Sequence, residues 1–280
     1  MTAVVENVRR FFSLHWPQTL QNWDEADDRF GKLIEEDFSD PGANANGYAE
    51  DGLYPETVTT ICLAKDYSIP NVLPMAFYHL SRVPLSNDWS SRRNHPNLSD
   101  RLSAHTFSAR WDLLRQEDWS ILHAGRQKVW SFLSNIWSPQ IQSHCNLHCR
   151  DPQRGCQSNV QRHTSLQNLP ADDAMFSDPL RTLRVRFCNP IQALQEELMV
   201  CDMCARVISS CTTELREYLW SRLPEYYACQ NPGVSPASSS PDPAEFLFDP
   251  SDVDNLVGSE SVQHDEEVND GGALALRLYG

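Results

Sequence analysis

Apolar residues recur three and four positions apart along most of the chain, and this spacing is the feature that most limits its possible folds. The period is that of an α-helix with one buried face, whereas the alternation typical of a β-strand is scarce. We therefore predict a mainly α fold, an irregular multi-helix domain with long loops. The helices are expected over residues 2–14, 55–69, 72–83, about 99–137 with a break or a close-packing point at Gly125, a short stretch after Asp178-Pro179, and 190–223.

Proline, glycine and polar residues interrupt this helical pattern and set the expected domain limits. Residues 31–52 combine acidic side chains with a Pro-Gly-Ala-Asn run, so we expect an exposed flexible insert. Several prolines fall within residues 138–177, where we expect irregular chain. Residues 231–280 are rich first in Pro and Ser and then in acidic residues, which predicts a disordered acidic C-terminal tail. One helical interaction domain then covers residues 1–230.

Charge excludes several classes of function. The net charge is −15, and residues 24–51 and 231–280 carry more than all of this negative charge, so the rest of the chain is nearly neutral and slightly positive. A nucleic-acid groove would gather Lys and Arg on one face, and we expect no nucleic-acid partner. We interpret the two acidic segments as solvated chain.

The chain shows neither a membrane span nor a secretion signal. No apolar run approaches the roughly 18 residues that a spanning helix needs. The first 14 residues carry Glu6, Arg9 and Arg10 among their apolar positions, unlike the uninterrupted apolar region of a signal peptide. We expect no membrane partner and an intracellular location, in the cytoplasm or the nucleus.

Two pairs of cysteines stand out among the nine in the chain. Cys145 and Cys149 form a C-x3-C pair, and Cys201 and Cys204 form a C-x2-C pair. In a reducing compartment thiols are free or bound to metal, and two separated pairs are a common way to build a tetrahedral structural zinc site. We predict Cys145, Cys149, Cys201 and Cys204 as the metal ligands, with His144, His148 and Cys156 as nearby spare ligands.

An alternative explains the second pair without metal. Cys201, Cys204 and Cys211 share a helical stripe with Ile208 and Leu215, and a free cysteine on such a stripe behaves as a small apolar core residue. The distances among the sulfurs distinguish the two hypotheses, because four sulfurs within about 4 Å of one another fit a tetrahedral zinc site.

Catalytic signatures are absent from the sequence. It contains no G-x-S-x-G, G-x-G-x-x-G, P-loop or H-E-x-x-H motif. The nine histidines are dispersed in polar contexts. Adjacent carboxylates such as Asp172 and Asp173 point apart. We therefore predict no catalytic residues and no enzymatic activity, and we expect most of the eight tryptophans to belong to the core.

Several segments, taken in order, resemble the large family of BTB/POZ-domain proteins of mushroom-forming fungi. Residues 14–24 (LHWPQTLQNWD) resemble the family's FPxTLxxWD segment, and residues 63–78 (LAKDYSIPNVLPMAFY) its LAxxxxVPxILPAAFY segment. Residues 109–114 (ARWDLL) and the Asp118…Gly125 segment follow. The run from Cys201-Asp202-Met203-Cys204 to residues 216–224 is similar to LCxxC…R…WxxLP. The resemblance covers residues 10–225.

The resemblance implies a helical region that follows a BTB domain, which is a dimerisation and docking module. There is no room for a whole BTB fold before Leu14, so the BTB domain is expected to be missing and the oligomeric state is left open. The family's paired cysteines match Cys145, Cys149, Cys201 and Cys204. We therefore expect a non-catalytic protein–protein interaction module with an unknown protein partner, stabilised by structural zinc. The alternative is a zinc-containing transcription or chromatin-associated factor, which would present a basic face beside the metal.

Overall fold

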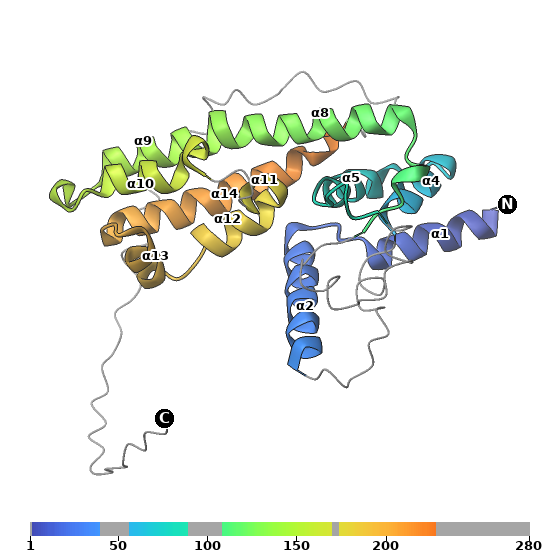
Figure 1. Ribbon diagram of the computed structural model, residues 1–280, viewed down its shortest axis with the longest axis horizontal. Coiled ribbons are helices and arrows are strands. Elements are labelled where there is room, and N and C mark those ends of the chain that lie inside the picture. Colours follow the sequence, from blue (N-terminus) through green and yellow to red (C-terminus); the bar gives the residue numbers. More distant parts are fainter. Residues whose placement is uncertain (1, 40–55, 89–107, 170–173, 228–280) are drawn as a thin grey trace, which may run out of the picture. The chain divides into compact units, whose positions relative to one another are not determined.

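The computed structural model describes residues 2–39, 56–88, 108–169 and 174–227 (Figure 1). Within these ranges every regular element is a helix, apart from an isolated bridge between Asp88 and Ala109. The mainly α prediction is therefore confirmed. The elements in chain order are α1 (Thr2–His15), α2 (Leu20–Ser39), α4 (Thr57–Asp66), η1 (Pro70–Val72), α5 (Leu73–Ser81), η2 (Trp111–Leu113), α8 (Gln116–Phe132), η3 (Leu133–Trp137), α9 (Ser138–His148), η4 (Pro152–Arg154), α10 (Cys156–Thr164), η5 (Leu166–Asn168), α11 (Ala174–Ser177), α12 (Pro179–Phe187), α13 (Ile191–Leu198) and α14 (Asp202–Tyr226).

The helices α8 and α9 are joined without a loop by η3, a single π-helical turn. The backbone N–H of Ser138 donates to the carbonyl of Leu133, five residues back instead of four, and such a wide turn accommodates one extra residue within a continuous helix. Both Leu133 and Trp137 are buried. Pro139 directly follows this π turn as the second residue of α9, so the proline stands beside a widened turn and does not end the helix.

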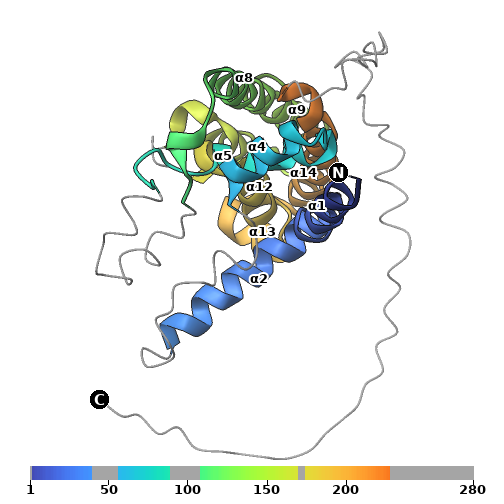
Figure 2. The same cartoon turned by 90° about the vertical axis from the view of Figure 1, so that its right-hand side faces the viewer.

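The last helix, α14, packs along α9, α8, α12 and α13 (Figures 1 and 2). Its buried positions Val207, Ile208, Cys211, Leu215 and Leu219 repeat at intervals of three and four, which is the stripe that the sequence predicts. This helix forms the centre of the C-terminal helices and contacts α5 as well.

The N-terminal helices pack around buried tryptophans. Trp16 and Trp23 are almost fully buried, and the Trp23 ring meets the rings of Tyr78 at 5.3 Å and Trp220 at 5.7 Å. The core prediction for tryptophan holds for Trp16, Trp23 and Trp137, whereas four of the others are only partly buried. The amphipathic helix predicted over residues 2–14 and the helix pair on either side of residues 67–71 are both confirmed as α1, α4 and α5.

The acidic segment that begins at residue 24 is not simply solvated chain. Asp24, Asp27 and Asp28 lie on α2 and contact four arginines: Arg82, which caps the end of α5, Arg181 and Arg184 of α12, and Arg216 of α14. Asp27 is 3% exposed, and its Oδ1 lies 3.0 Å from Nη2 of Arg82. Buried carboxylates of this kind require partners, since an unpaired buried charge is costly.

The sequence-based boundaries differ from the observed ones at two further places. Helix α2 extends through residues 31–39 of the expected insert, since one glycine inside a helix costs only about 1 kcal/mol and good helix formers follow Gly31. The single helix expected over 190–223 is two helices, because Met199 adopts a left-handed conformation (φ 53°) that ends α13.

The region expected to be irregular, residues 138–177, is mostly helical in its described part: α9 and α10 occupy half of it, and η4, η5 and α11 add shorter helical turns. Gly125 does not break α8; it is a close-packing point, because an added Cβ would overlap the ring of Tyr227. The remainder of the expected insert and the tail over 231–280 lie outside the described residues. In the described part of the chain, no helix is long and apolar enough to cross a lipid bilayer.

Candidate metal centre

Four thiols from three separate segments converge between α9, α10 and α14. The sulfurs of Cys149, Cys156, Cys201 and Cys204 all lie within 4.8 Å of one another. In a tetrahedral zinc–thiolate site with Zn–S bonds of about 2.3 Å, neighbouring sulfurs are about 3.8 Å apart. The four sulfurs therefore need to close by at most about 1 Å around an ion, and the cluster is able to hold a metal such as zinc.

Cys149 reaches the cluster because α9 ends one residue before it. Its backbone is extended (φ −63°, ψ 119°), so the chain leaves the helix axis at this residue. The turn that follows is stabilised by Asp151, whose carboxylate accepts a hydrogen bond from the backbone N–H of Arg154. Asp151 thus folds the chain back toward the other cysteines after a short 3₁₀ turn.

Cys156 is placed by a glycine. Gly155 has a left-handed backbone (φ 74°) that a side chain would strain, and Cys156 directly after it begins α10. The Cys156 side chain is fully buried, and its Sγ accepts a hydrogen bond of 3.2 Å from the backbone N–H of Cys201. Hydrogen bonds of this kind orient metal ligands.

The C-x2-C pair sits at the start of α14. Cys201 is the N-cap residue of this helix, and Cys204 lies in its first turn. Backbone N–H groups and the positive end of the helix dipole favour thiolates there. Cys204 is fully buried and Cys201 is 7% exposed, so the position that favours negative charge is also shielded from water.

The acidities of the four thiols differ for identifiable reasons. Burial raises the pKa of Cys201, but hydrogen bonds to the backbone and thiol of Cys204 outweigh it and lower the pKa to about 7. Burial raises the pKa of Cys149 and brings that of Cys156 to about 12. The neighbouring Cys145 side chain, together with burial, raises the pKa of Cys204. Without metal, one thiol is poised to ionise and three are held protonated, so metal binding here releases protons.

The structure brings together three of the four sequence-predicted ligands, and Cys156 takes the place expected for Cys145. Cys145 is buried inside α9, where its thiol donates to the carbonyl of Cys204 over 3.9 Å. The reason is that Cys145 lies within the helix and faces α14, whereas Cys149 lies beyond the helix end. Neither His144 nor His148 is part of the four-thiol cluster.

Cys156 could have been recognised from one sequence signal. It follows an Asp-Pro-Gln-Arg-Gly turn, and Cys149 and Cys156 flank that turn on both sides. A tight turn between two cysteines brings their side chains to one place, as the C-x2-C spacing does. The core-cysteine alternative accounts for Cys211, which is buried on α14 and lies outside the cluster.

The arrangement is that of a closed site. All four donors are thiols and three of them are buried, so a tetrahedral ion here would have no position open for water or substrate. Closed sites of four thiolates hold structure together, whereas catalytic zinc keeps an open position.

Comparison with protein-family models, with curated proteins and with solved structures finds no significant match.

Proposed function

We propose that this chain is a non-catalytic protein–protein interaction module whose C-terminal helices are fixed by one structural zinc ion. The observation that carries the proposal is the convergence of Cys149, Cys156, Cys201 and Cys204 within 4.8 Å. An ion bound there would join the end of α9, the start of α10 and the start of α14. These helices already pack on one another, so the ion would act as a cross-link among them.

The resemblance to the fungal BTB/POZ proteins supports the same proposal. Its separate segments meet in the structure: Trp23 contacts Trp220, Trp23 contacts Tyr78, and Asp24 pairs with Arg216. A set of motifs whose members contact one another is what a shared helical fold requires. By this resemblance we propose that the chain serves as the partner-facing part of an adaptor.

We propose that the partner binds beside the metal centre. Leu147 and Met199 each lie two residues from a cluster cysteine, and their side chains are 74% and 50% exposed. Leu147 lies in the last turn of α9 and Met199 caps the end of α13, and exposed apolar side chains positioned by helices are effective interface anchors.

Two measurements on the intact chain test this proposal. Elemental analysis of protein purified without a metal-affinity step should give one zinc per chain. Quantitative affinity purification should recover a partner that Leu147→Asp and Met199→Asp lose and that Leu85→Asp, at a site 60% exposed elsewhere, retains. Protein without zinc, or a partner equally insensitive to all three substitutions, would contradict it.

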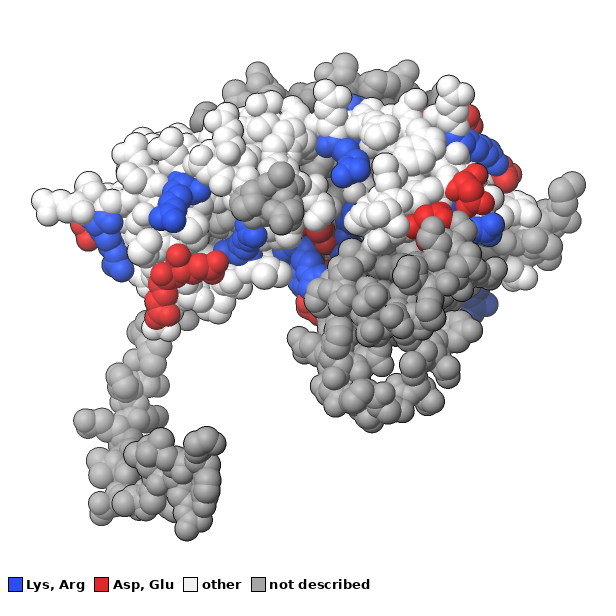
Figure 3. Space-filling model, viewed as in Figure 1, with Lys and Arg blue, Asp and Glu red and all other residues white. Residues whose placement is uncertain are grey.

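The charge distribution gives the transcription-factor alternative no comparable support. On the face seen in Figure 3, the Lys and Arg side chains of the described residues are interspersed with Asp and Glu. A DNA-binding titration at several salt concentrations discriminates between the two, because phosphate contacts impose a steep salt dependence.

A further inference from the structure

A fifth thiol adjoins the four-thiol cluster without belonging to it. The side chain of Cys145 on α9 is 1% exposed and lies against Cys204 on α14. The contacts are reciprocal, because each sulfur lies 3.9 Å from the carbonyl oxygen of the other residue. The Cys145 thiol also has the largest influence on the pKa of the Cys204 thiol, which it raises. The two thiols therefore face each other where α9 and α14 pack together.

Cys204 is a neighbour both of Cys145 and of the other cluster sulfurs. Its sulfur lies within 4.8 Å of the sulfurs of Cys149, Cys156 and Cys201, and the Cys149 and Cys204 thiols share a hydrogen bond. Cys149 is partly exposed, whereas the other four thiols are buried. Three thiols thus form a row. It begins with Cys149 at the exposed edge of the cluster, passes through Cys204 and ends at the buried Cys145.

We propose that Cys145 and Cys204 form a disulfide when a peroxide oxidises the cluster, and that this disulfide takes Cys204 away from the metal. A sulfur bonded to Cys145 no longer supplies a ligand, because the thiolate is the form that binds metal. The ion would keep three of its four thiolates, and such a site is no longer of the closed structural kind. The inference rests on the proposed function for the metal itself, whereas the disulfide is independent of it.

The oxidation balances with one molecule of hydrogen peroxide and two thiols. The peroxide oxidises Cys149, the accessible thiol, to a sulfenic acid and releases water. The Cys204 thiol attacks the sulfenic sulfur, which forms a Cys149–Cys204 disulfide and expels a second water. The Cys145 thiol then attacks the Cys204 sulfur and releases Cys149 as a thiol. In the zinc-loaded protein Cys204 starts as a thiolate, and the solvent supplies the missing proton.

Burial determines where the oxidation ends. Cys149 is the thiol that solvent reaches, whereas Cys145 and Cys204 are 1% and 0% exposed. A disulfide between these two packed helices is therefore shielded from a bulky reductant such as glutathione, since thiol–disulfide exchange requires access to the sulfur. Bond formation at about 2.05 Å requires both side chains to turn toward each other from the carbonyl oxygens that they now contact.

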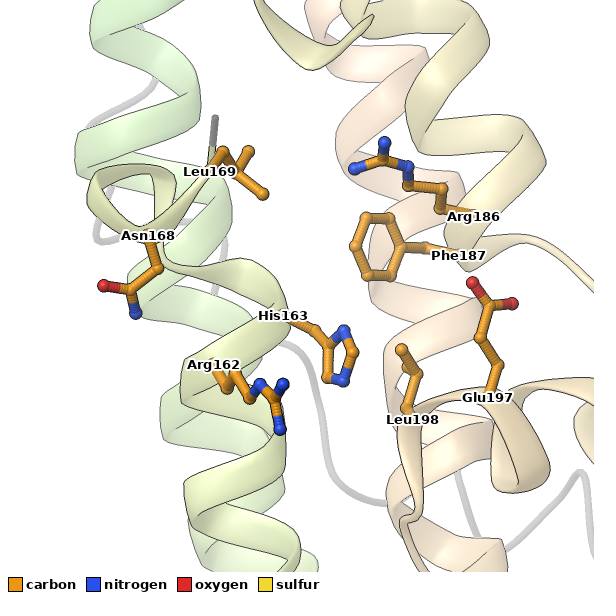
Figure 4. Close-up of a pocket in the computed structure, with 8 residues that line it drawn as sticks. All are labelled: Arg162, His163, Asn168, Leu169, Arg186, Phe187, Glu197 and Leu198. Atoms are coloured by element: carbon orange, nitrogen blue, oxygen red, sulfur yellow. The ribbon is translucent and has the colours of Figure 1, made fainter. Parts of the chain in front are cut away.

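The state of these thiols would reach beyond the cluster. Cys156 begins α10 and Cys201 follows α13. These two helices, together with α12, wall a cavity of about 530 Å³ (Figure 4). In Figure 4 the His163 side chain extends from α10 toward Leu198 of α13. An ion at the cluster would fix the separation of these two walls, and its release would remove that constraint.

The test is oxidation of the intact chain, loaded with zinc in one arm and metal-free in the other. Hydrogen peroxide is added stepwise, the remaining thiols are blocked with N-ethylmaleimide in denaturant, and mass mapping of non-reduced peptides locates the disulfide. A chromophoric chelator records zinc release. We expect a Cys145–Cys204 disulfide in both arms, with zinc released in parallel in the first.

Two variants separate Cys145 from the other buried thiols. Cys145→Ser keeps the four cluster thiols, so it should bind zinc, but its oxidation should stop at a disulfide that includes the exposed Cys149. Glutathione should then restore zinc binding at least about tenfold faster in Cys145→Ser than in wild type, because the sulfur under attack is accessible. Cys211→Ser is the matched control, since Cys211 is buried on α14 outside the cluster, and it should behave as wild type.

Two outcomes would overturn the inference. One is a Cys145 thiol that N-ethylmaleimide still modifies fully in the oxidised protein. The other is an equal rate of recovery with glutathione for wild type and Cys145→Ser. A chain that binds no zinc would contradict the proposed function instead, and the disulfide map of the metal-free arm would still decide the inference.

Discussion

The guanidinium of Arg216 on α14 donates two hydrogen bonds to the carboxylate of Asp24 on α2, although the two residues are 192 positions apart in the sequence. Nη1 of Arg216 lies 2.8 Å from Oδ2 of Asp24, and its Nε donates to the carbonyl of Leu180 over 2.7 Å. One side chain thereby joins α2, α12 and α14. Together with the neighbouring contact between Trp23 and Trp220, the pair connects the first helices to the last.

Replacing Arg216 should destabilise the protein strongly. Arg216→Met removes a side chain that is 7% exposed and leaves Asp24 without its bidentate partner. Breaking a buried pair from one side costs about 3 kcal/mol or more. Urea unfolding followed by circular dichroism measures the loss in the free energy of unfolding.

The matched control for this substitution is Arg206→Met. The Arg206 side chain is 40% exposed and pairs with Asp202 one turn earlier on the same helix. An exposed pair of this kind contributes about 0.5 kcal/mol. Equal losses for the two variants would show that Arg216 owes its effect to α14 alone and not to the contact with α2.

Metal binding should distinguish Cys156 from Cys145. Cys156→Ser removes one of the four clustered thiols, and we expect loss of bound zinc and weaker Co²⁺–thiolate absorption bands. Cys145→Ser should retain one metal per chain, because the Cys145 thiol contacts a backbone carbonyl instead. Metal loss in Cys145→Ser with retention in Cys156→Ser would reverse the assignment.

Removing the metal should lower the thermal stability of the wild-type protein. A ligand that binds only the folded state at 100 times its Kd stabilises it by about 2.7 kcal/mol. A chelator should therefore lower the melting temperature of wild type and Cys145→Ser and leave that of Cys156→Ser unchanged. Differential scanning fluorimetry measures all three.

Gly125→Ala should destabilise the protein although alanine favours helices. The added methyl group would overlap the Tyr227 ring, which is fully buried, and overpacking of this kind costs about 2 kcal/mol. In a Tyr227→Ala background the clash is gone, and Gly125→Ala should instead stabilise α8 by up to about 1 kcal/mol. The change of sign between backgrounds, read from denaturant midpoints, is the diagnostic result.

The stability of the protein should fall between pH 7.5 and 5.5 because of His79. Burial and the nearby Arg82 charge hold the pKa of His79 well below 6.5, so its imidazole stays neutral in the folded state. The unfolded chain takes up a proton as the pH drops through about 6.5. Because of His79 alone, the free energy of unfolding should therefore fall by about 1.4 kcal/mol as the pH drops from 7.5 to 5.5.

His79→Gln should reduce this pH dependence while other groups keep theirs. The comparison uses the difference between wild type and variant at each pH, so proton uptake elsewhere cancels. The pKa of Asp178 is raised by burial above its usual value of 3.8; its contribution therefore has the opposite sign and belongs to lower pH. Parallel curves for wild type and His79→Gln would contradict the assignment.

The sequence was sufficient to predict those helices that have a regular apolar spacing or a capping residue and a proline at their first turn. The apolar spacing of residues 2–14 predicts α1, and Pro179 after the capping residue Asp178 predicts the start of α12. Three of the four clustered cysteines were recognisable for the same reason, because their spacing is local.

The remaining features depend on contacts that local spacing does not encode. Proline at 139 indicates a helix break unless a π turn precedes it, and Met199 ends a helix without the glycine usual at a left-handed position. That Cys156, and not the predicted Cys145, belongs to the thiol cluster also depends on such contacts. It depends on which of two cysteines faces α14 and which lies beyond the end of α9, and packing decides that.

The π turn at residues 133–137 uses five residues for about the rotation that an ordinary α-helical turn makes with four. Deleting one residue there would restore an ordinary turn and leave Cys145 on the face of α9 that meets α14. A deletion in a regular turn of α9 would instead rotate everything beyond it by about 100° around the helix axis. The extra residue in η3 therefore lengthens the α8–α9 helix without changing the side from which the chain leaves it toward Cys149.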